Sequence, residues 1–168
     1  MIVVGYYGVG KSTAAQKHYE IVDIAPKYFK KIDKLDDGSK SEWIENGEGL
    51  KRYIWLVKDL NKEGFIVCVP PTKEVRAAIK EDKEILKKEI VYICPRIDEK
   101  NEWMKHLYAR WDESQTLHDE MTFERARVNY ESDIKDMIDD DVKIIWVDPG
   151  MITRNGLFAI LQKEEIIR

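Results

Sequence analysis

The sequence has little of several residue types, and each shortage disfavours a class of protein. It has two cysteines in 168 residues, too few for a disulfide-rich secreted scaffold. It has no apolar run long enough to cross a membrane. Positive charge is not in excess, because the formal net charge is −4 and the two signs are well mixed. This balance disfavours nucleic acid as the main partner, although it leaves room for a local basic groove.

The start of the chain and its cysteines favour a cytoplasmic protein. The chain opens directly on a short β-branched run, so we expect no secretory leader. Cys68 and Cys94 stand alone in β-type runs, without metal-ligand spacing, so we expect two free thiols. An apolar share of 43% is enough for one core at this length, and we expect a single domain over residues 1–168.

Residues 5–13 match a phosphate-binding loop. Gly5-Tyr6-Tyr7-Gly8-Val9-Gly10-Lys11-Ser12-Thr13 fits the spacing G-x-x-x-x-G-K-[ST], between a predicted strand and a predicted helix. In such a loop the backbone N–H groups point inward and the start of the helix adds partial positive charge, so phosphate oxygens bind there. Glycine permits the positive φ and the close approach to phosphate that the loop requires. The alternative is a glycine-rich turn with a chance lysine.

The loop residues have separate expected roles with ATP and Mg²⁺. Lys11 can reach the β- and γ-phosphates, and the hydroxyl of Ser12 can ligate Mg²⁺. The residues expected around the nucleotide are Gly5, Gly8, Val9, Gly10, Lys11, Ser12 and Thr13.

Apolar runs and helical periodicity alternate along the rest of the chain. Further strands are predicted over residues 21–25, 65–69, 90–94 and 143–147, with helices between them and a last helix over 157–167. Strands that are apolar on both faces favour an α/β fold, with a three-layer arrangement around a parallel sheet and a ligand site at the carboxyl ends of its strands. Residues from about 26 to 49 read as an irregular excursion of functional importance. Residues 112–120 read as a polar stretch between two helices.

With this order, the chain resembles the nucleoside monophosphate kinase branch of the P-loop proteins, and more narrowly the small nucleotide-kinase-like proteins of bacteriophages. The matching pieces are the loop, Val22-Asp23-Ile24, residues 69–76, residues 91–95, and Trp103 to Arg110 leading into Asn129-Tyr130-Glu131. Of these, the loop alone is specific. The resemblance implies a P-loop NTPase fold with strand order 2-3-1-4-5. It also implies an acceptor-binding excursion at about 26–49 and a mobile lid at about 110–122.

In enzymes of this type the lid supplies arginines that hold the transferring phosphoryl group. Positioned cations also have a physical reason there, because phosphoryl transfer spreads negative charge over the equatorial oxygens. Arg110 is our first candidate, and Arg125 and Arg127 are the second ones. The alternative for all three is solvated charge on a helix.

The sequence departs from the family where a carboxylate usually ends strand three. Val69-Pro70-Pro71 stands there, so either Asp23 or Asp148 supports Mg²⁺, or Ser12 and the nucleotide hold the metal alone. The alternative for Asp148 is an aspartate of a turn. Asp23 is a candidate for catalysis and for contact with the acceptor, and its alternative is a role in the turn before Pro26.

Three further groups have weaker assignments. Arg76 is a candidate ligand for an acceptor phosphate, because a basic residue in the first turn of a helix is unfavourable without an anion nearby. Aromatic residues of the excursion could stack on a base or belong to the core; they are Tyr28, Phe29 and Trp43. The histidines are expected at the surface; they are His18, His106 and His118.

The sequence therefore predicts an enzyme that transfers the γ-phosphoryl group of ATP to a nucleoside monophosphate or a similar small acceptor. One rival is the same chemistry on another acceptor, such as a polynucleotide end or a small metabolite. A rival of another class is an ATP-binding regulator or NTPase without a small-molecule acceptor. The sequence identifies neither the base and sugar of an acceptor nor the oligomeric state.

Overall fold

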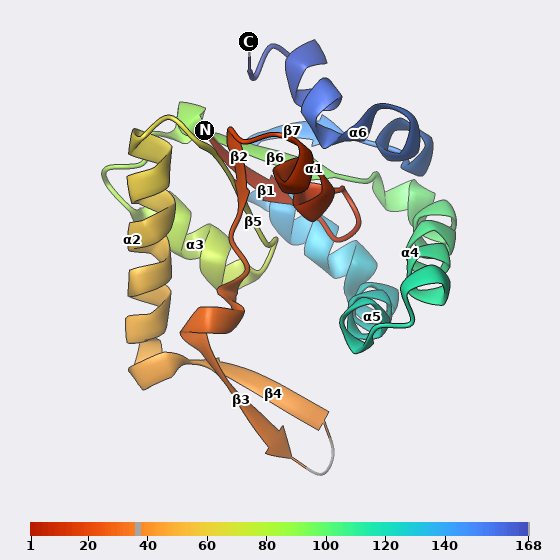
Figure 1. The fold of residues 1–168 in the computed structure, drawn as a ribbon, viewed down its shortest axis with the longest axis horizontal. Coiled ribbons are helices and arrows are strands. Elements are labelled where there is room, and N and C mark those ends of the chain that lie inside the picture. Colours follow the sequence, from red (N-terminus) through yellow and green to blue (C-terminus); the bar gives the residue numbers. More distant parts are fainter. Residues whose placement is uncertain (36–37, 168) are drawn as a thin grey trace.

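A parallel sheet with helices on both faces forms the body of the molecule in the computed structural model, which describes residues 1–35 and 38–167 (Figure 1). Its strands are β1 (Ile2–Gly5), β2 (Ile21–Asp23), β5 (Ile66–Val69), β6 (Ile90–Cys94) and β7 (Lys143–Trp146). They pair in the order β2-β5-β1-β6-β7, all parallel. Counted along the chain within this sheet, the order is 2-3-1-4-5, which confirms the prediction.

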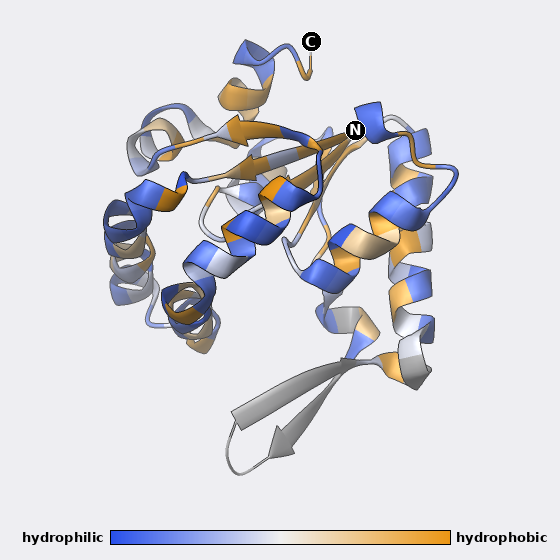
Figure 2. Cartoon of the chain, turned by 180° about the vertical axis from the view of Figure 1, so that it is seen from behind, coloured by the Kyte–Doolittle hydropathy of each residue, from blue (hydrophilic) through white to orange (hydrophobic). Residues whose placement is uncertain are grey.

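The helices are α1 (Lys11–Lys17), α2 (Glu48–Lys62), α3 (Lys73–Glu81), α4 (Lys100–Ser114), α5 (Leu117–Asp139) and α6 (Pro149–Lys163). Helix α1 lies on the face of the sheet seen in Figure 1, and α3 and α5 lie on the face seen in Figure 2. Every residue of β1, β5 and β6 is buried as a result. This explains why these strands read as continuous apolar runs rather than alternating ones. No helix in the described part of the chain is both long and apolar enough to cross a bilayer.

Residues 26–49 are more regular than we expected. The 3₁₀ turn Pro26–Phe29 leads into β3 (Lys30–Leu35), which pairs antiparallel with β4 (Gly38–Trp43), and a second 3₁₀ turn follows at Ile44–Gly47. The hairpin projects away from the body (Figure 1). The prediction of an irregular excursion was wrong because charged residues and serine make up most of these strands, so the alternation that marks a strand is weak.

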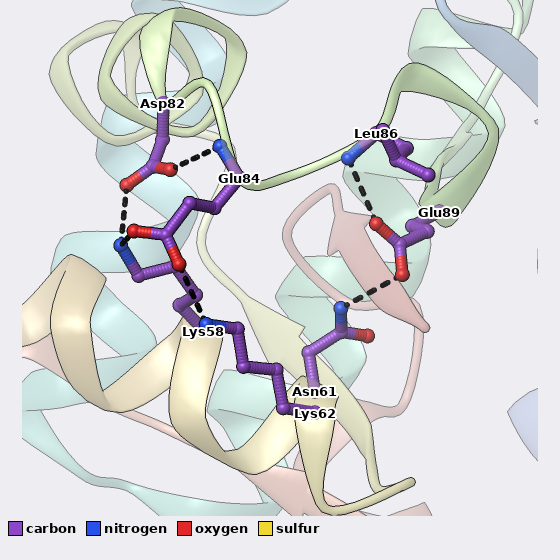
Figure 3. A network of polar contacts seen from close by, with 7 residues as sticks. All are labelled: Lys58, Asn61, Lys62, Asp82, Glu84, Leu86 and Glu89. Atoms are coloured by element: carbon purple, nitrogen blue, oxygen red, sulfur yellow. Dashed lines mark hydrogen bonds and ion pairs between the residues drawn. The ribbon is translucent and has the colours of Figure 1, made fainter.

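The connection after α3 is held against α2 by polar contacts (Figure 3). The Nζ of Lys58 lies 3.1 Å from Asp82 and 2.9 Å from Glu84, and Lys62 lies 2.6 Å from Glu84. The hydrogen bonds from Lys62 and Lys58 lower the pKa of Glu84 to about 2. This connection follows the end of α3 at Glu81, so Leu86 lies beyond the helix, and it is exposed.

Two helix boundaries near the site also differ from expectation. Helix α4 continues to Ser114, and Gln115 and Thr116 alone separate it from α5. Gln115 takes a left-handed conformation with φ 51°, and the side chain of Thr116 accepts a hydrogen bond from the Asp119 amide as the N-cap of α5. The polar stretch is therefore mostly helical surface. Helix α6 starts at Pro149 rather than at 157 and is kinked at Gly156.

Candidate functional site

The glycine-rich loop, residues 5–13, joins the central strand β1 to α1. Gly8 and Gly10 have φ values of +86° and +85°, a conformation that other residues rarely adopt. A Cβ on Gly8 would lie 2.7 Å from a methyl group of Leu107. A Cβ on Gly5 would lie 2.7 Å from Val9 and 2.9 Å from the Lys11 side chain. The shape of the loop therefore requires glycine at these positions.

The side chain of Lys11 folds back over the start of the loop. Its Nζ donates to the carbonyl oxygens of Gly5 at 2.5 Å and Tyr6 at 3.2 Å. Burial lowers the pKa of Lys11, and the nearby charge of Asp23 opposes this shift in part. An anion bound at the loop would favour the charged form of this ammonium group.

Ser12 and Asp23 are brought together from different elements. The hydroxyl of Ser12, in the first turn of α1, donates to the carboxylate of Asp23 at the end of β2 over 2.6 Å. Asp148, the other candidate carboxylate, accepts a hydrogen bond from the Met151 amide at 2.8 Å and is the N-cap of α6. The geometry thus places Asp23, and not Asp148, beside the hydroxyl that we expected to bind the metal.

A cavity of about 570 Å³ opens over the loop and collects most of the predicted site residues. From the loop and α1 it is lined by Tyr7, Gly8, Gly10, Lys11, Ser12, Thr13 and Gln16. From the ends of β2 and β5 it is lined by Asp23, Ile24, Ala25, Pro26, Pro70 and Pro71. From the remaining helices it is lined by His106, Arg110, His118, Thr122 and Ile152. Lys11, Ser12, Asp23 and Arg110 therefore share one cavity.

Helix α4 contacts the loop along one face. The indole N–H of Trp103 donates to the carbonyl oxygen of Tyr7 at 2.9 Å, and Nε2 of His106 lies 3.1 Å from the carbonyl oxygen of Gly8. Arg110 follows on the same face, because residues four apart on a helix lie above one another. We expected His106 at the surface, but it is half-buried against the loop. Its helical spacing from Trp103 and Arg110 was the signal that could have revealed this.

Arg110 is held by a residue that the sequence reading did not single out. Its guanidinium lies 2.7 Å from the carboxylate of Asp119, whose side chain is 8% exposed. The hydroxyl of Ser114 donates to the same carboxylate at 2.6 Å, and that of Thr116 does so at 3.2 Å. Burial raises the pKa of Asp119, but the hydrogen bond from Ser114 and the charge of Arg110 outweigh it and leave this pKa below its usual value.

The other candidate arginines do not line this cavity. Arg127 pairs with Glu124 at 2.7 Å on the exposed surface of α5, and Arg125 is exposed as well. Arg76 is buried, and its guanidinium lies 2.7 Å from Asp140. It lines a separate cavity of about 320 Å³. A basic residue in the first turn of α3 needs an anion nearby, and here that anion is the carboxylate of Asp140.

The aromatic residues of the excursion pack on α2. The rings of Phe29 and Trp43 lie 5.5 and 5.7 Å from the ring of Tyr53, which is fully buried. These contacts favour the core interpretation over stacking on a base. The side chain of Tyr28 lies outside the described residues.

A second cavity, of about 280 Å³, adjoins the first at Gly10, Thr13 and Ile152. Its far side is formed by residues of α6 and by His18, whose ring stacks on Phe158 at 3.8 Å. The residues that line the two cavities together extend from Asp23, across the loop, to α6.

Metal binding at this site would depend on the bound ligand. The described residues contain no group of three or more histidine, cysteine or acidic side chains that could hold a metal ion. One hydroxyl and one carboxylate, those of Ser12 and Asp23, suit a magnesium ion that takes its other ligands from phosphates and water.

Comparison with models of known protein families, with curated proteins and with solved structures finds no match to this chain.

Proposed function

We propose that the protein has the P-loop NTPase fold, binds ATP with Mg²⁺ at the glycine-rich loop, and transfers the γ-phosphoryl group to a small acceptor. The observation that carries this proposal is the shared cavity: Lys11, Ser12, Asp23 and Arg110 come from α1, β2 and α4 and line one space over the loop. The strand order β2-β5-β1-β6-β7, with the loop at the end of the central strand, supports it further.

Each residue has a part in phosphoryl transfer. The ammonium of Lys11 neutralises charge on the β- and γ-phosphates, in place of its present bonds to the loop carbonyls. The oxygen of Ser12 is a ligand for the magnesium ion that the nucleotide carries, and its hydrogen bond to Asp23 orients that oxygen. The metal itself supplies positive charge to the phosphate oxygens. Arg110, which α4 contributes to the same cavity, stabilises charge on the transferring group.

The second cavity suits the nucleoside part of ATP. It continues from Gly10 and Thr13, where the loop ends, and Ile152, Leu157 and Phe158 give it apolar walls. A triphosphate seated on the loop would then have its nucleoside towards α6 and its γ-phosphate towards Asp23.

One observation favours a second candidate function, a nucleotide-dependent switch without an acceptor. Strand β5 ends at Val69 and is followed by Pro70 and Pro71, so no carboxylate follows it on the cavity wall. A switch needs ATP binding but no arginine directed at a transferring group. Arg110 on the cavity wall, fixed by Asp119, favours a kinase over a switch.

The test is the melting temperature with and without ATP and Mg²⁺, followed by an assay of ADP formation with and without acceptors. At an ATP concentration about 100-fold above Kd, binding should stabilise the wild type by about 2.7 kcal/mol. Lys11→Ala should show no such rise, and Lys135→Ala, on the exposed surface of α5, should behave as the wild type. An equal rise in wild type and Lys11→Ala would show that the loop is not the nucleotide site.

A further inference from the structure

Two donors from α4 reach successive carbonyl oxygens of the glycine-rich loop. Nε1 of Trp103 donates to the oxygen of Tyr7 at 2.9 Å, and Nε2 of His106 lies 3.1 Å from the oxygen of Gly8. Lys11 engages the carbonyl oxygens of the two residues before them. The carbonyls of four consecutive loop residues therefore contact donors of this chain. A peptide group held in this way cannot rotate freely, so its orientation is fixed.

Glycine at position 8 permits the shape of the loop but does not select it. Gly8 has a φ of +86°, which glycine reaches at no steric cost, and the same freedom gives it many other conformations. The N–H of Val9, in the peptide group that carries the Gly8 oxygen, donates to Tyr6 over 3.4 Å, which is long for a hydrogen bond. The contact of the Gly8 oxygen with His106 is the shorter of these two. We therefore expect it to contribute more to holding this peptide group in one orientation.

The contact also indicates which ring nitrogen of His106 carries a hydrogen. A carbonyl oxygen only accepts hydrogen bonds, so Nε2 has to donate. The neutral ring then has its hydrogen on Nε2 rather than on Nδ1. The helix that presents this donor is firmly packed, because its residues Trp103 and Leu107 are 0% and 2% exposed. The donor therefore has a rigid support beside a loop that is rich in glycine.

We propose that His106 is a positioning residue that holds the glycine-rich loop in its ATP-binding shape through the carbonyl of Gly8. This inference rests on the proposed function. A loop that spends part of its time in other shapes binds ATP more weakly, because apparent affinity falls with the fraction of molecules that are competent to bind. The hydrogen bond raises that fraction in the empty protein. His106 thus acts on ATP affinity, whereas Arg110, one turn further along α4, acts on the transferring group.

The first experiment measures the Kd of ATP with Mg²⁺ by calorimetric titration of three variants. His106→Leu removes the donor and keeps a large side chain, so Kd should rise by about 3- to 10-fold, the factor that corresponds to one hydrogen bond. His106→Gln should recover most of the affinity, because its amide nitrogen is as many bonds from Cβ as Nε2 is. His106→Asn is one bond shorter, falls short of the Gly8 oxygen, and should behave like His106→Leu. The control is Asn101→Leu, a change of an uncharged, exposed residue of α4, which should bind ATP as the wild type does.

A second readout separates this role from packing and from catalysis. In His106→Leu, kcat at saturating ATP should stay within about 3-fold of the wild type, because a loop with ATP bound has already adopted the competent shape. A lower kcat with an unchanged Kd would place His106 in the transfer step and overturn the inference. A lower melting temperature with an unchanged Kd would leave a packing role alone and overturn it as well. So would a raised Kd that His106→Gln does not restore.

The third experiment needs no nucleotide. Long-range ¹H–¹⁵N NMR spectra of the neutral ring in the empty wild type show which nitrogen of His106 carries the hydrogen. The chain has three histidines, and the signal that is missing in His106→Gln identifies this one. We expect the hydrogen on Nε2. A hydrogen on Nδ1 would show that the contact with Gly8 is not a hydrogen bond and would overturn the inference.

The two proposals fail in distinguishable ways. A wild-type protein whose melting temperature does not respond to ATP and Mg²⁺ would remove the nucleotide site, and both proposals with it. A wild type that binds ATP, together with a His106→Leu variant that binds it equally well, would retain the proposed function and lose this inference.

Discussion

The guanidinium of Arg110 lies 2.7 Å from the carboxylate of Asp119, and these two residues come from consecutive helices. The carboxylate is buried and receives hydrogen bonds from Ser114 and Thr116, which flank or form the turn between α4 and α5. Arg110 itself is 43% exposed and lines the cavity that contains Lys11. The turn therefore fixes one side of the guanidinium and leaves the other accessible to a ligand, an arrangement suited to a positioned arginine.

We expect Arg110→Ala to lower kcat by about 10²-fold or more while the affinity for ATP changes little, because such an arginine acts mainly on the transition state. Arg110→Lys should recover part of the loss, since a point charge does not reproduce a planar two-pronged contact. The measurement is kcat with the best acceptor, together with ATP affinity. Arg127→Ala is the matched control, because Arg127 pairs with Glu124 on the exposed surface of α5. Equal turnover in Arg110→Ala and wild type would exclude Arg110 from catalysis.

Asp119 should act through Arg110. Asp119→Asn keeps an acceptor for Ser114 but loses the charge that holds Arg110, so kcat should fall by about 10-fold with ATP affinity unchanged. The double variant with Arg110→Ala should be no slower than Arg110→Ala alone, because residues that act as one unit are not additive. Losses that multiplied in the double variant would show that Asp119 contributes independently. Asp119→Ala should also destabilise the fold by about 1–3 kcal/mol, since it removes the charged acceptor of the hydrogen bonds from Ser114 and Thr116.

The sheet could be predicted from the sequence because its strands are short apolar runs that end at glycine or proline. Val69 is followed by two prolines, and Cys94 by Pro95, so these runs had clear boundaries. The hairpin β3–β4 was missed because its first strand, Lys30–Leu35, is mostly charged and its pairing depends on the partner strand. The extension of α4 to Ser114 was missed because a polar helix surface and a polar loop have similar composition.

Likewise, some residues of the candidate site could be predicted from the sequence and others could not. Lys11 and Ser12 follow from a local spacing, and the position of Asp23 at a strand end follows from the expected sheet. The partner of Arg110 could not be deduced, because Asp119 is nine residues away in another helix and its burial depends on the turn between them. The pairing of Arg76 with Asp140 joins residues 64 positions apart, and no local pattern indicates it.

The two cysteines should be unreactive in the folded protein. Cys68 and Cys94 are buried, and burial raises the pKa of each thiol to about 12, so almost no thiolate is present at neutral pH. We expect no reaction with a thiol reagent in the native state and two equivalents after denaturation.

Cys68 and Cys94 are too far apart to form a disulfide with each other. Their strands, β5 and β6, lie on opposite sides of β1, about 9–10 Å apart across two strand spacings. Because a disulfide needs Cα atoms within about 7 Å, finding one between them would contradict the strand order.

The lowered pKa of Lys11 gives ATP binding a pH dependence of definite sign. In the empty protein burial disfavours the ammonium form, whereas bound phosphates favour it. At a pH between the lowered pKa and the pKa with ATP bound, binding must therefore take up a proton, and affinity falls as pH rises through this range. The empty protein should gain stability as pH rises from the lowered pKa towards 10.5, because only the unfolded chain then keeps the proton.

Calorimetric titration of ATP in buffers with different ionisation enthalpies measures this proton uptake directly. Lys11→Arg is the matched variant, because arginine remains charged throughout the range and its residual binding should show neither uptake nor slope. The pH range should begin above about 7.5, where the last ionisation of the phosphates, near a pKa of about 6, is complete. Proton uptake of the same size in both proteins would assign the effect to another group, and the absence of uptake in the wild type would show that Lys11 keeps its charge when the loop is empty.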